Sequence, residues 1–241
     1  MTLTLRSVPK NATIIQGYPG FGLVGTIATE YLLEHLKCEP IGRILLEEQP
    51  ALIAIHEGRV VEPIGIFYSK KHNLVVVHAI NSTSGAEWKI AELVVELAKK
   101  VNARELVCIE GVGSPEKNGE EEEQTYRTFY YANKAQNAKK LQTLKIEQLR
   151  EGIIMGVTSA LLLDAGGSFP ITCLFAETKT HLPDSKAAAN ALTTLSNYLG
   201  LKLNIKPLLD SAEHFEQKLH SLLEKSKGAV GKQKKDLTYL G

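Results

Sequence analysis

The sequence predicts an α/β fold with a mixed, partly parallel sheet flanked by helices. Short apolar segments separated by turn residues fill positions 41–80. This stretch leaves no room for crossover helices, so part of the sheet is expected to be antiparallel. Residues 84–113 then combine an amphipathic helix with a buried strand that ends in glycines. This alternation is typical of a parallel portion of sheet.

The first half of the chain is expected to be rich in strands. The expected elements are a strand over 12–16, a helix over about 22–36, strands over 41–48, 51–58, 59–69 and 73–80, a helix from 84 to 101, and a strand over 105–114. Ser84 and Glu87 have the spacing of a capping box, in which each side chain satisfies a backbone donor at the helix start. Ser84 is therefore predicted to open that helix.

The second half begins with a solvated acidic loop over 114–124. The expected elements after it are a strand over 125–132, a helix over 133–144, a short strand leading into a helix within 152–166, a strand over 170–177, and helices over 185–199 and about 206–227. Asp184 and Gly200 are typical N-cap and C-cap residues for the helix over 185–199. We expect one α/β domain over 1–227, including a helical C-terminal extension, and a flexible tail over 228–241.

Composition limits the classes of partner. Of the 241 residues, 44% are hydrophobic and 23% are charged, as in ordinary soluble globular proteins. The net charge of +1 gives no electrostatic reason to expect nucleic acid or an anionic membrane. No apolar run approaches the roughly 20 residues that span a bilayer, and the N-terminus lacks the pattern of a signal peptide. These features indicate a cytoplasmic protein.

A glycine-rich loop follows the first expected strand. Gly20, Gly22 and Gly25 form a G-x-G-x-x-G pattern, in which glycines let the backbone approach a pyrophosphate at a helix N-terminus. However, residues 17–19 separate the strand from the pattern, and the segments that follow are strands instead of a second βαβ unit. We therefore interpret the loop as a tight turn that brings the helix close to the sheet, with dinucleotide binding as the alternative.

Candidate ligand-binding residues lie where buried strands end. Glu110 follows a buried strand and precedes two glycines, and Glu177 ends the last buried strand. In α/β proteins ligands bind at the carboxyl ends of the strands. The possible ligand cleft consists of Gly20, Gly22, Glu110, Gly111, Gly113 and Glu177.

The remaining chemistry-bearing residues are assigned to the core. His78 lies in the apolar segment VVVHAI and is expected to be a hydrogen-bonded core histidine. Cys38, Cys108 and Cys173 lack the short spacing of a zinc site, and we interpret them as buried structural thiols. No metal, cofactor or catalytic residue is predicted.

The end of the chain carries a hydrophobic tip on a basic, glycine-containing tail. The tip consists of Leu237, Tyr239, Leu240 and Gly241, with Thr238 among them. A disordered tail has no packing reason to end in this way. Two explanations remain open: the tip binds a groove on a partner through an aromatic anchor and the terminal carboxylate, or it folds back on its own domain.

Four blocks of sequence occur in an order and spacing shared with a known family. They are Gly17–Gly25, Glu110–Gly113, the segment 152–166, and Phe175–Leu195. The last block is the most specific, since it joins a strand end, a proline–aspartate turn and an alanine-rich helix. Together they resemble the proteasome assembly chaperone family in its archaeal form, over about residues 13–223.

The resemblance implies a layout similar to nucleoside phosphorylase-like folds, assembly into homo-oligomers, and binding to 20S proteasome α-subunits or the α-ring. Family members that dock on this ring use a C-terminal hydrophobic–tyrosine–any-residue motif, whose carboxylate pairs with a lysine in the pocket. Here Tyr239 is third from the end instead of second. The carboxylate therefore lies one residue, up to about 3.5 Å, further from the tyrosine than in the motif.

The function expected from this resemblance is that of a non-catalytic, cytoplasmic, archaeal chaperone that binds proteasome subunits and needs no cofactor. It is expected to bind neither nucleic acid nor membrane. The alternative is a nucleotide- or carboxylate-binding enzyme that uses the glycine-rich cleft at the strand ends.

Overall fold

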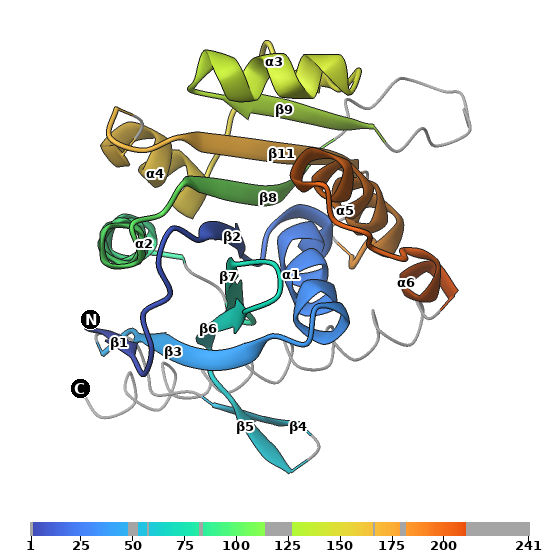
Figure 1. Cartoon of the computed structure of the whole chain (residues 1–241). Helices are drawn as coiled ribbons and strands as arrows, with labels where there is room; N and C mark the ends of the chain where they lie inside the picture. Colours follow the sequence, from blue (N-terminus) through green and yellow to red (C-terminus); the bar gives the residue numbers. More distant parts are fainter. Residues whose placement is uncertain are drawn as a thin grey trace, which may run out of the picture.

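Nine of the described strands form one mixed sheet in the computed structural model, in the order β1-β3-β6-β7-β2-β8-β11-β9-β10 (Figure 1). The structure describes residues 2–47, 53–56, 58–81, 84–113, 127–165, 167–178 and 182–210. The strands of this sheet are β1 (Thr2–Leu5), β2 (Thr13–Gly17), β3 (Glu39–Leu45), β6 (Ile64–Ser69), β7 (Leu74–Ala79), β8 (Glu105–Gly113), β9 (Thr128–Ala132), β10 (Glu147–Gln148) and β11 (Ile171–Thr178). A separate hairpin pairs β4 (Ala54–His56) with β5 (Arg59–Val61).

Four parallel strands, β7, β2, β8 and β11, form the middle of the sheet. Every residue of β7 and β11 is buried, as expected for strands covered on both faces. The antiparallel strands β6, β3 and β1 extend the sheet on one side, and β9 pairs antiparallel with β11 on the other. The predicted mixed, partly parallel sheet is confirmed.

Helices cover both faces of this sheet (Figure 1). The helices of the described chain are α1 (Val24–His35), α2 (Glu87–Val101), α3 (Ala135–Thr143), α4 (Val157–Ala165), α5 (Ser185–Leu199) and α6 (Lys206–Asp210). Helices α1 and α5 pack on one face, and α2 and α4 on the other. Successive strand residues alternate between the two layers, so that Cys108 faces α2 and α4 while Ile109 faces α1 and α5.

Several strand predictions are corrected by the structure. Residues 59–69 are two strands, β5 and β6, because Pro63 has no backbone N–H to continue a ladder. The strand expected within 152–156 is absent, and those residues form an irregular connection. Strands β1 and β10 were not predicted, since both are short and largely exposed.

The predicted capping residues are confirmed for helix α5 but not for helix α2. The Asp184 side chain accepts a hydrogen bond from the Ala187 N–H at 2.9 Å, and Gly200 ends α5 with φ +68, as predicted. The predicted capping box is wrong, because α2 begins at Glu87 and its N-cap is Ala86, which makes no side-chain cap. Gly85, with φ +82, turns the chain ahead of the helix.

The glycine-rich loop brings backbone against backbone. A side-chain carbon on Gly17 would lie 2.1 Å from the carbonyl oxygen of Gly25, and one on Gly111 would lie 2.1 Å from that of Phe21. One on Gly25 would lie 2.5 Å from the carbonyl oxygen of Ile109. No real carbon tolerates such distances, so β2, β8 and the start of α1 can meet only through glycines. These contacts support the interpretation of the loop as a tight structural turn.

We predict that Gly111→Ala lowers the free energy of unfolding by ~3 kcal/mol, because the new methyl group overlaps the fixed carbonyl of Phe21. Urea unfolding followed by circular dichroism measures this change.

The matched control is Gly113→Ala on the same strand, where nothing lies within 4 Å of the added carbon. It is expected to change the free energy of unfolding by less than about 0.5 kcal/mol. Equal losses for both variants would contradict the close-approach explanation.

Candidate functional site

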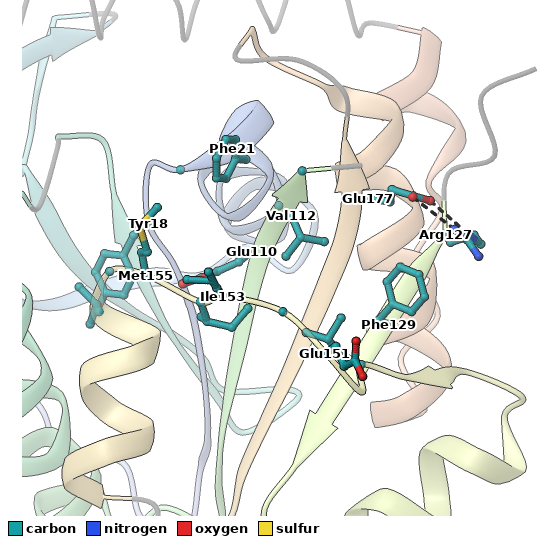
Figure 2. Close-up of a pocket in the computed structure, with 18 of the residues that line it drawn as sticks. Tyr18, Phe21, Glu110, Val112, Arg127, Phe129, Glu151, Ile153, Met155 and Glu177 are labelled. Atoms are coloured by element: carbon teal, nitrogen blue, oxygen red, sulfur yellow. Dashed lines mark hydrogen bonds and ion pairs between the residues drawn. The ribbon is translucent and has the colours of Figure 1, made fainter. Parts of the chain in front are cut away.

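A cavity of about 860 Å³ lies at the carboxyl ends of β2, β8 and β11 (Figure 2). Its walls come from the loop 18–21 after β2, the end of β8, the start of β9, strand β10, and the connection 149–156 that leads into α4. These segments meet because the carboxyl ends of parallel strands share one edge of the sheet. The volume falls within the range of roughly 300–1,000 Å³ typical of small-molecule sites.

The structure brings five of the six predicted cleft residues to this cavity: Gly20, Glu110, Gly111, Gly113 and Glu177. Gly22 is not part of the lining. It has φ +60, and its carbonyl accepts a hydrogen bond of 2.8 Å from the backbone N–H of Asp184. Gly22 therefore serves the turn that joins the loop to the start of α5. That a ligand occupies the cavity stays a prediction.

Glu110 is a partly buried carboxyl group on the wall next to α4. Burial raises the pKa of Glu110 to about 7, and the nearby hydroxyl group of Thr158 at the start of α4 lowers it only in part. No lysine, arginine or histidine of the described chain forms an ion pair with this carboxyl group. Near neutral pH it is therefore divided between its protonated and ionised forms.

Glu177 forms a two-point ion pair with Arg127 across the cavity edge (Figure 2). The Nε atom of Arg127 lies 3.1 Å from Oε2 of Glu177, and Nη2 lies 3.3 Å from Oε1. The guanidinium group also lies 5.2 Å from the ring centre of Phe129. Hydrogen bonding and charge attraction to Glu177 raise the pKa of Arg127. The positive charge of Arg127 is thus already compensated.

Polar side chains of β2, β8 and the loop after β2 contact one another at the cavity wall. The Tyr18 hydroxyl donates to Oε1 of Gln16 at 3.2 Å, and Nε2 of Gln16 lies 3.1 Å from the Cys108 sulfur. Burial, with a smaller contribution from Cys108 and Glu110, raises the pKa of Tyr18 well above its usual value. Tyr18 therefore stays a neutral phenol at the cavity wall.

The connection 150–156 forms a wall that sequence reasoning did not assign to the site. Ile153 and Met155 are 90% and 67% exposed, although both are apolar. Their apolar run suggested a strand, but the flanking residues Gly152 and Gly156 were a turn signal that favoured a loop. Gly156 has φ +87, which fits a break just before α4.

His78 is a core residue, as predicted. Its Nδ1 lies 2.8 Å from Oγ1 of Thr29, and its Nε2 lies 3.0 Å from Oε2 of Glu30. The imidazole of His78 thus lies between the hydroxyl group of Thr29 and the carboxylate of Glu30. His78 is 2% exposed and Thr29 is fully buried, so no substrate reaches the hydroxyl.

Cys108 and Cys173 are buried on adjacent strands, in agreement with the prediction of structural thiols. Cys38 is only half-buried, and burial raises its pKa to about 11, so its thiol stays protonated. Across the part of the chain that the structure covers, no three His, Cys, Asp or Glu side chains group as a metal site would need. None of the helices in that part is long and apolar enough to cross a membrane.

Comparison with known proteins identifies the family. A model described as the PAC2 family matches residues 14–223. The chain belongs to the PAC2 family. This finding confirms the resemblance that the four sequence blocks indicated.

Solved PAC2-like structures share the whole fold with this chain. Pyrococcus furiosus PbaA, described as an archaeal homolog of proteasome-assembly chaperone, is 31% identical and superposes with a TM-score of 0.83, covering 95% of this chain and 98% of PbaA. PbaB of the same organism, described as an archaeal proteasome activator, is 22% identical with a TM-score of 0.72, covering 92% of this chain and 98% of PbaB.

A relative found by sequence also matches nearly the whole chain. This uncharacterised protein of Methanocaldococcus jannaschii is 27% identical over 230 residues, which cover 94% of this chain and 92% of the relative.

The predicted partner-binding tip lies outside the described residues. Leu237, Tyr239, Leu240 and Gly241 belong to 211–241, as does most of the helix expected over 206–227, of which α6 is the described start. The division of this PAC2 chain into a domain over 1–227 and a tail over 228–241 likewise stays a prediction.

We predict that Glu110→Gln raises the free energy of unfolding by about 3 kcal/mol at pH 8. The folded-state pKa of Glu110 is about 7, against 4.5 for an ordinary glutamate. The folded state therefore holds the proton more tightly, and stability falls as pH rises from about 4.5 to about 7. Glutamine removes this loss. Urea unfolding of both proteins between pH 4.5 and pH 8 measures the difference, which should vanish at the acidic end.

Glu96→Gln serves as the control, since Glu96 lies on the exposed face of α2 in a 3.4 Å pair with Lys100. Its effect on the free energy of unfolding at pH 8 should be below about 0.5 kcal/mol, because exposed ion pairs contribute little to stability. A pH-independent effect of Glu110→Gln would show that the carboxyl group titrates normally.

Proposed function

We propose that this protein is a proteasome assembly chaperone, which binds 20S proteasome α-subunits or the α-ring and catalyses no reaction. The observation that carries this proposal is the similarity to PbaA, which extends over 98% of that chain at 31% identity. The likeness covers the sheet, both helical layers and the strand-end loops, so it concerns the whole body and not one motif. Such a protein works by differential affinity, holding subunits in an assembly-competent state and releasing them as the particle matures.

The C-terminal tip is the proposed contact element. Tyr239 offers a large anchor with one polar end, and Leu237 and Leu240 offer apolar groups beside it. The carboxylate of Gly241 can pair with a lysine or with backbone donors in a groove. Because Tyr239 is third from the end, the groove must accept one more residue between the anchor and the carboxylate than the family motif supplies.

We predict that the intact chain binds cognate proteasome α-subunits and that deletion of 239–241 weakens this binding at least tenfold. The deletion removes the aromatic anchor and moves the terminal carboxylate to residue 238. Native mass spectrometry of the mixtures measures complex formation. A complex that forms equally with both chains would keep the chaperone role and move the contact to the α/β body.

Single substitutions separate the anchor from the rest of the tip. Tyr239→Ala is expected to reduce the bound fraction as strongly as the deletion, whereas Thr238→Ala, with the same chain length and carboxylate, is expected to leave it unchanged. If the intact chain forms no complex with α-subunits or rings, the proposed function is wrong.

We also propose that the protein works as a homo-oligomer in the archaeal cytoplasm. The β4–β5 hairpin supports oligomerisation, because it projects from the main sheet (Figure 1) and its apolar side chains are exposed. Ile55 and Val60 face each other across the hairpin and are 68% and 59% exposed, and Ile53 lies on the same side. An isolated two-stranded hairpin is at best marginally stable, so a second copy of the chain is a suitable cover.

Ile55→Glu is expected to lower the particle mass toward the 26.4 kDa of one chain, because a carboxylate placed in an apolar contact must be desolvated. Light scattering after size-exclusion chromatography measures the mass. Leu163→Glu, which changes an exposed apolar residue on α4 instead, should leave the mass unchanged. A monomeric unsubstituted protein would refute the proposal.

A further inference from the structure

The cavity at the strand ends contains a carboxyl group without a cationic partner. Glu110 is held at the end of β8 and beside the first turn of α4, where burial disfavours its charge. A carboxylate removed from water without a counter-ion costs several kcal/mol in a protein interior, and folds avoid this arrangement unless it serves a purpose. No side chain in the described residues supplies the counter-ion.

Most of the other charges on the described lining are negative, like that of ionised Glu110. Carboxyl groups of the described lining are those of Glu87, Glu110, Glu147, Glu151 and Glu177, and the guanidinium groups are those of Arg127 and Arg150. The charges of Glu177 and Arg127 cancel in their two-point pair. Besides this pair, the described lining has four carboxyl groups and only one guanidinium group, that of Arg150. This excess of carboxyl groups gives the cavity a negative potential.

Apart from Ser84 and Gln148, most of the remaining described lining is apolar. Tyr18 and Phe129 contribute aromatic rings, and Val112 contributes an aliphatic wall at the end of β8 (Figure 2). Ile153 and Met155 stand exposed on the connection that borders the opening. A ligand that suits this lining has an apolar stem to cover these side chains and one positive head to meet Glu110.

We propose that the cavity binds a primary ammonium group carried on an unbranched apolar chain, with Glu110 as its counter-ion. Free alkyl diamines and lysine side chains share this chemistry. The site is independent of the proposed proteasome contact at the C-terminal tip and uses different residues. It also argues against the nucleotide- or carboxylate-binding enzyme considered from the sequence, because an anion would enter a negative cavity whose Arg127 is already paired with Glu177.

Binding of a cation links the site to pH. A bound ammonium group favours the ionised form of Glu110, so affinity rises as this carboxyl group loses its proton. Tyr18 and Cys173, which lie near Glu110, do not lose their protons near pH 7, where Glu110 does. Burial raises the pKa of Tyr18, and a hydrogen bond with Cys108 together with burial raises that of Cys173. Thr158 on α4 carries no charge.

The charged groups further out are Glu87 at the start of α2, Glu147, Arg150 and Glu151 on the connection, and the Arg127–Glu177 pair. Glu147, Glu151 and Arg150 are exposed, so salt screens their contribution. Measurements at physiological ionic strength therefore report chiefly on Glu110.

The test is isothermal titration calorimetry of the full chain at pH 8 and pH 6. The ammonium probes are 1,5-diaminopentane and Nα-acetyl-lysine methylamide, and the neutral counterparts are 1-pentanol and Nα-acetyl-norleucine methylamide. At pH 8 each ammonium probe is expected to bind about tenfold more tightly than its neutral counterpart. Affinity for the ammonium probes should fall about tenfold at pH 6, where most Glu110 is protonated.

Glu110→Gln should abolish both the preference for the ammonium group and the pH dependence, while Glu96→Gln on the exposed face of α2 should change neither. If Glu110→Gln fails to fold, the comparison of charged with neutral probes on the unsubstituted protein still decides the question. Binding of the lysine derivative alone identifies a peptide side chain as the ligand, and binding of the diamine alone identifies a free amine. Equal binding of neutral and charged probes, or no binding of either ammonium probe at millimolar concentration, overturns the proposal.

Discussion

The backbones of β2, β8 and the first turn of α1 meet without side chains between them, and the arrangement of the strand-end edge depends on this contact. Side-chain carbons on Gly17 and Gly111 would each lie 2.1 Å from a carbonyl oxygen of the facing segment. The close approach sets the path of the loop 18–21, which in turn forms one wall of the cavity. Because these glycines have no side chains, the facing backbones can come into direct contact. This role explains a pattern that otherwise suggests a pyrophosphate site.

The electrostatics of the cavity follow from the same geometry. Strand β8 carries Glu110 to the sheet edge on the face that α4 covers, so the carboxyl group is partly desolvated and gains no cation from the described residues. Glu177, on the neighbouring strand β11, meets Arg127 and forms a closed pair. Two glutamates at adjacent strand ends therefore have different properties, and the difference arises from their surroundings instead of their chemistry.

The fold and the proposed contacts of this PAC2 protein rest on different parts of the chain. The similarity to PbaA and PbaB covers the body of the molecule, where two helical layers enclose a central parallel sheet. The proposed proteasome contact lies in the last five residues, whereas the proposed ammonium site lies at the strand ends. A shared body can carry different contact elements, because the residues that bind partners contribute little to the core.

Local patterns in the sequence determined most of the secondary structure. Asp184 and Gly200 mark the ends of α5 through preferences that act within one helical turn, and the apolar runs of β7 and β11 require cover on both faces. The same local reasoning failed at Ser84, because the turn at Gly85 separates it from the helix, and at Ile153 and Met155, whose apolar character suggested a strand.

The sequence by itself also singled out Glu110 and Glu177 as strand-end residues, because a buried strand followed by a polar residue is visible locally. Only the tertiary structure decided that Arg127 pairs with Glu177, that no cation among the described residues pairs with Glu110, and that the connection 150–156 borders the cavity. These contacts join segments that are distant in the chain. Their proximity follows from the order of strands in the sheet, which is set by packing between whole layers and leaves no mark in a short stretch of sequence.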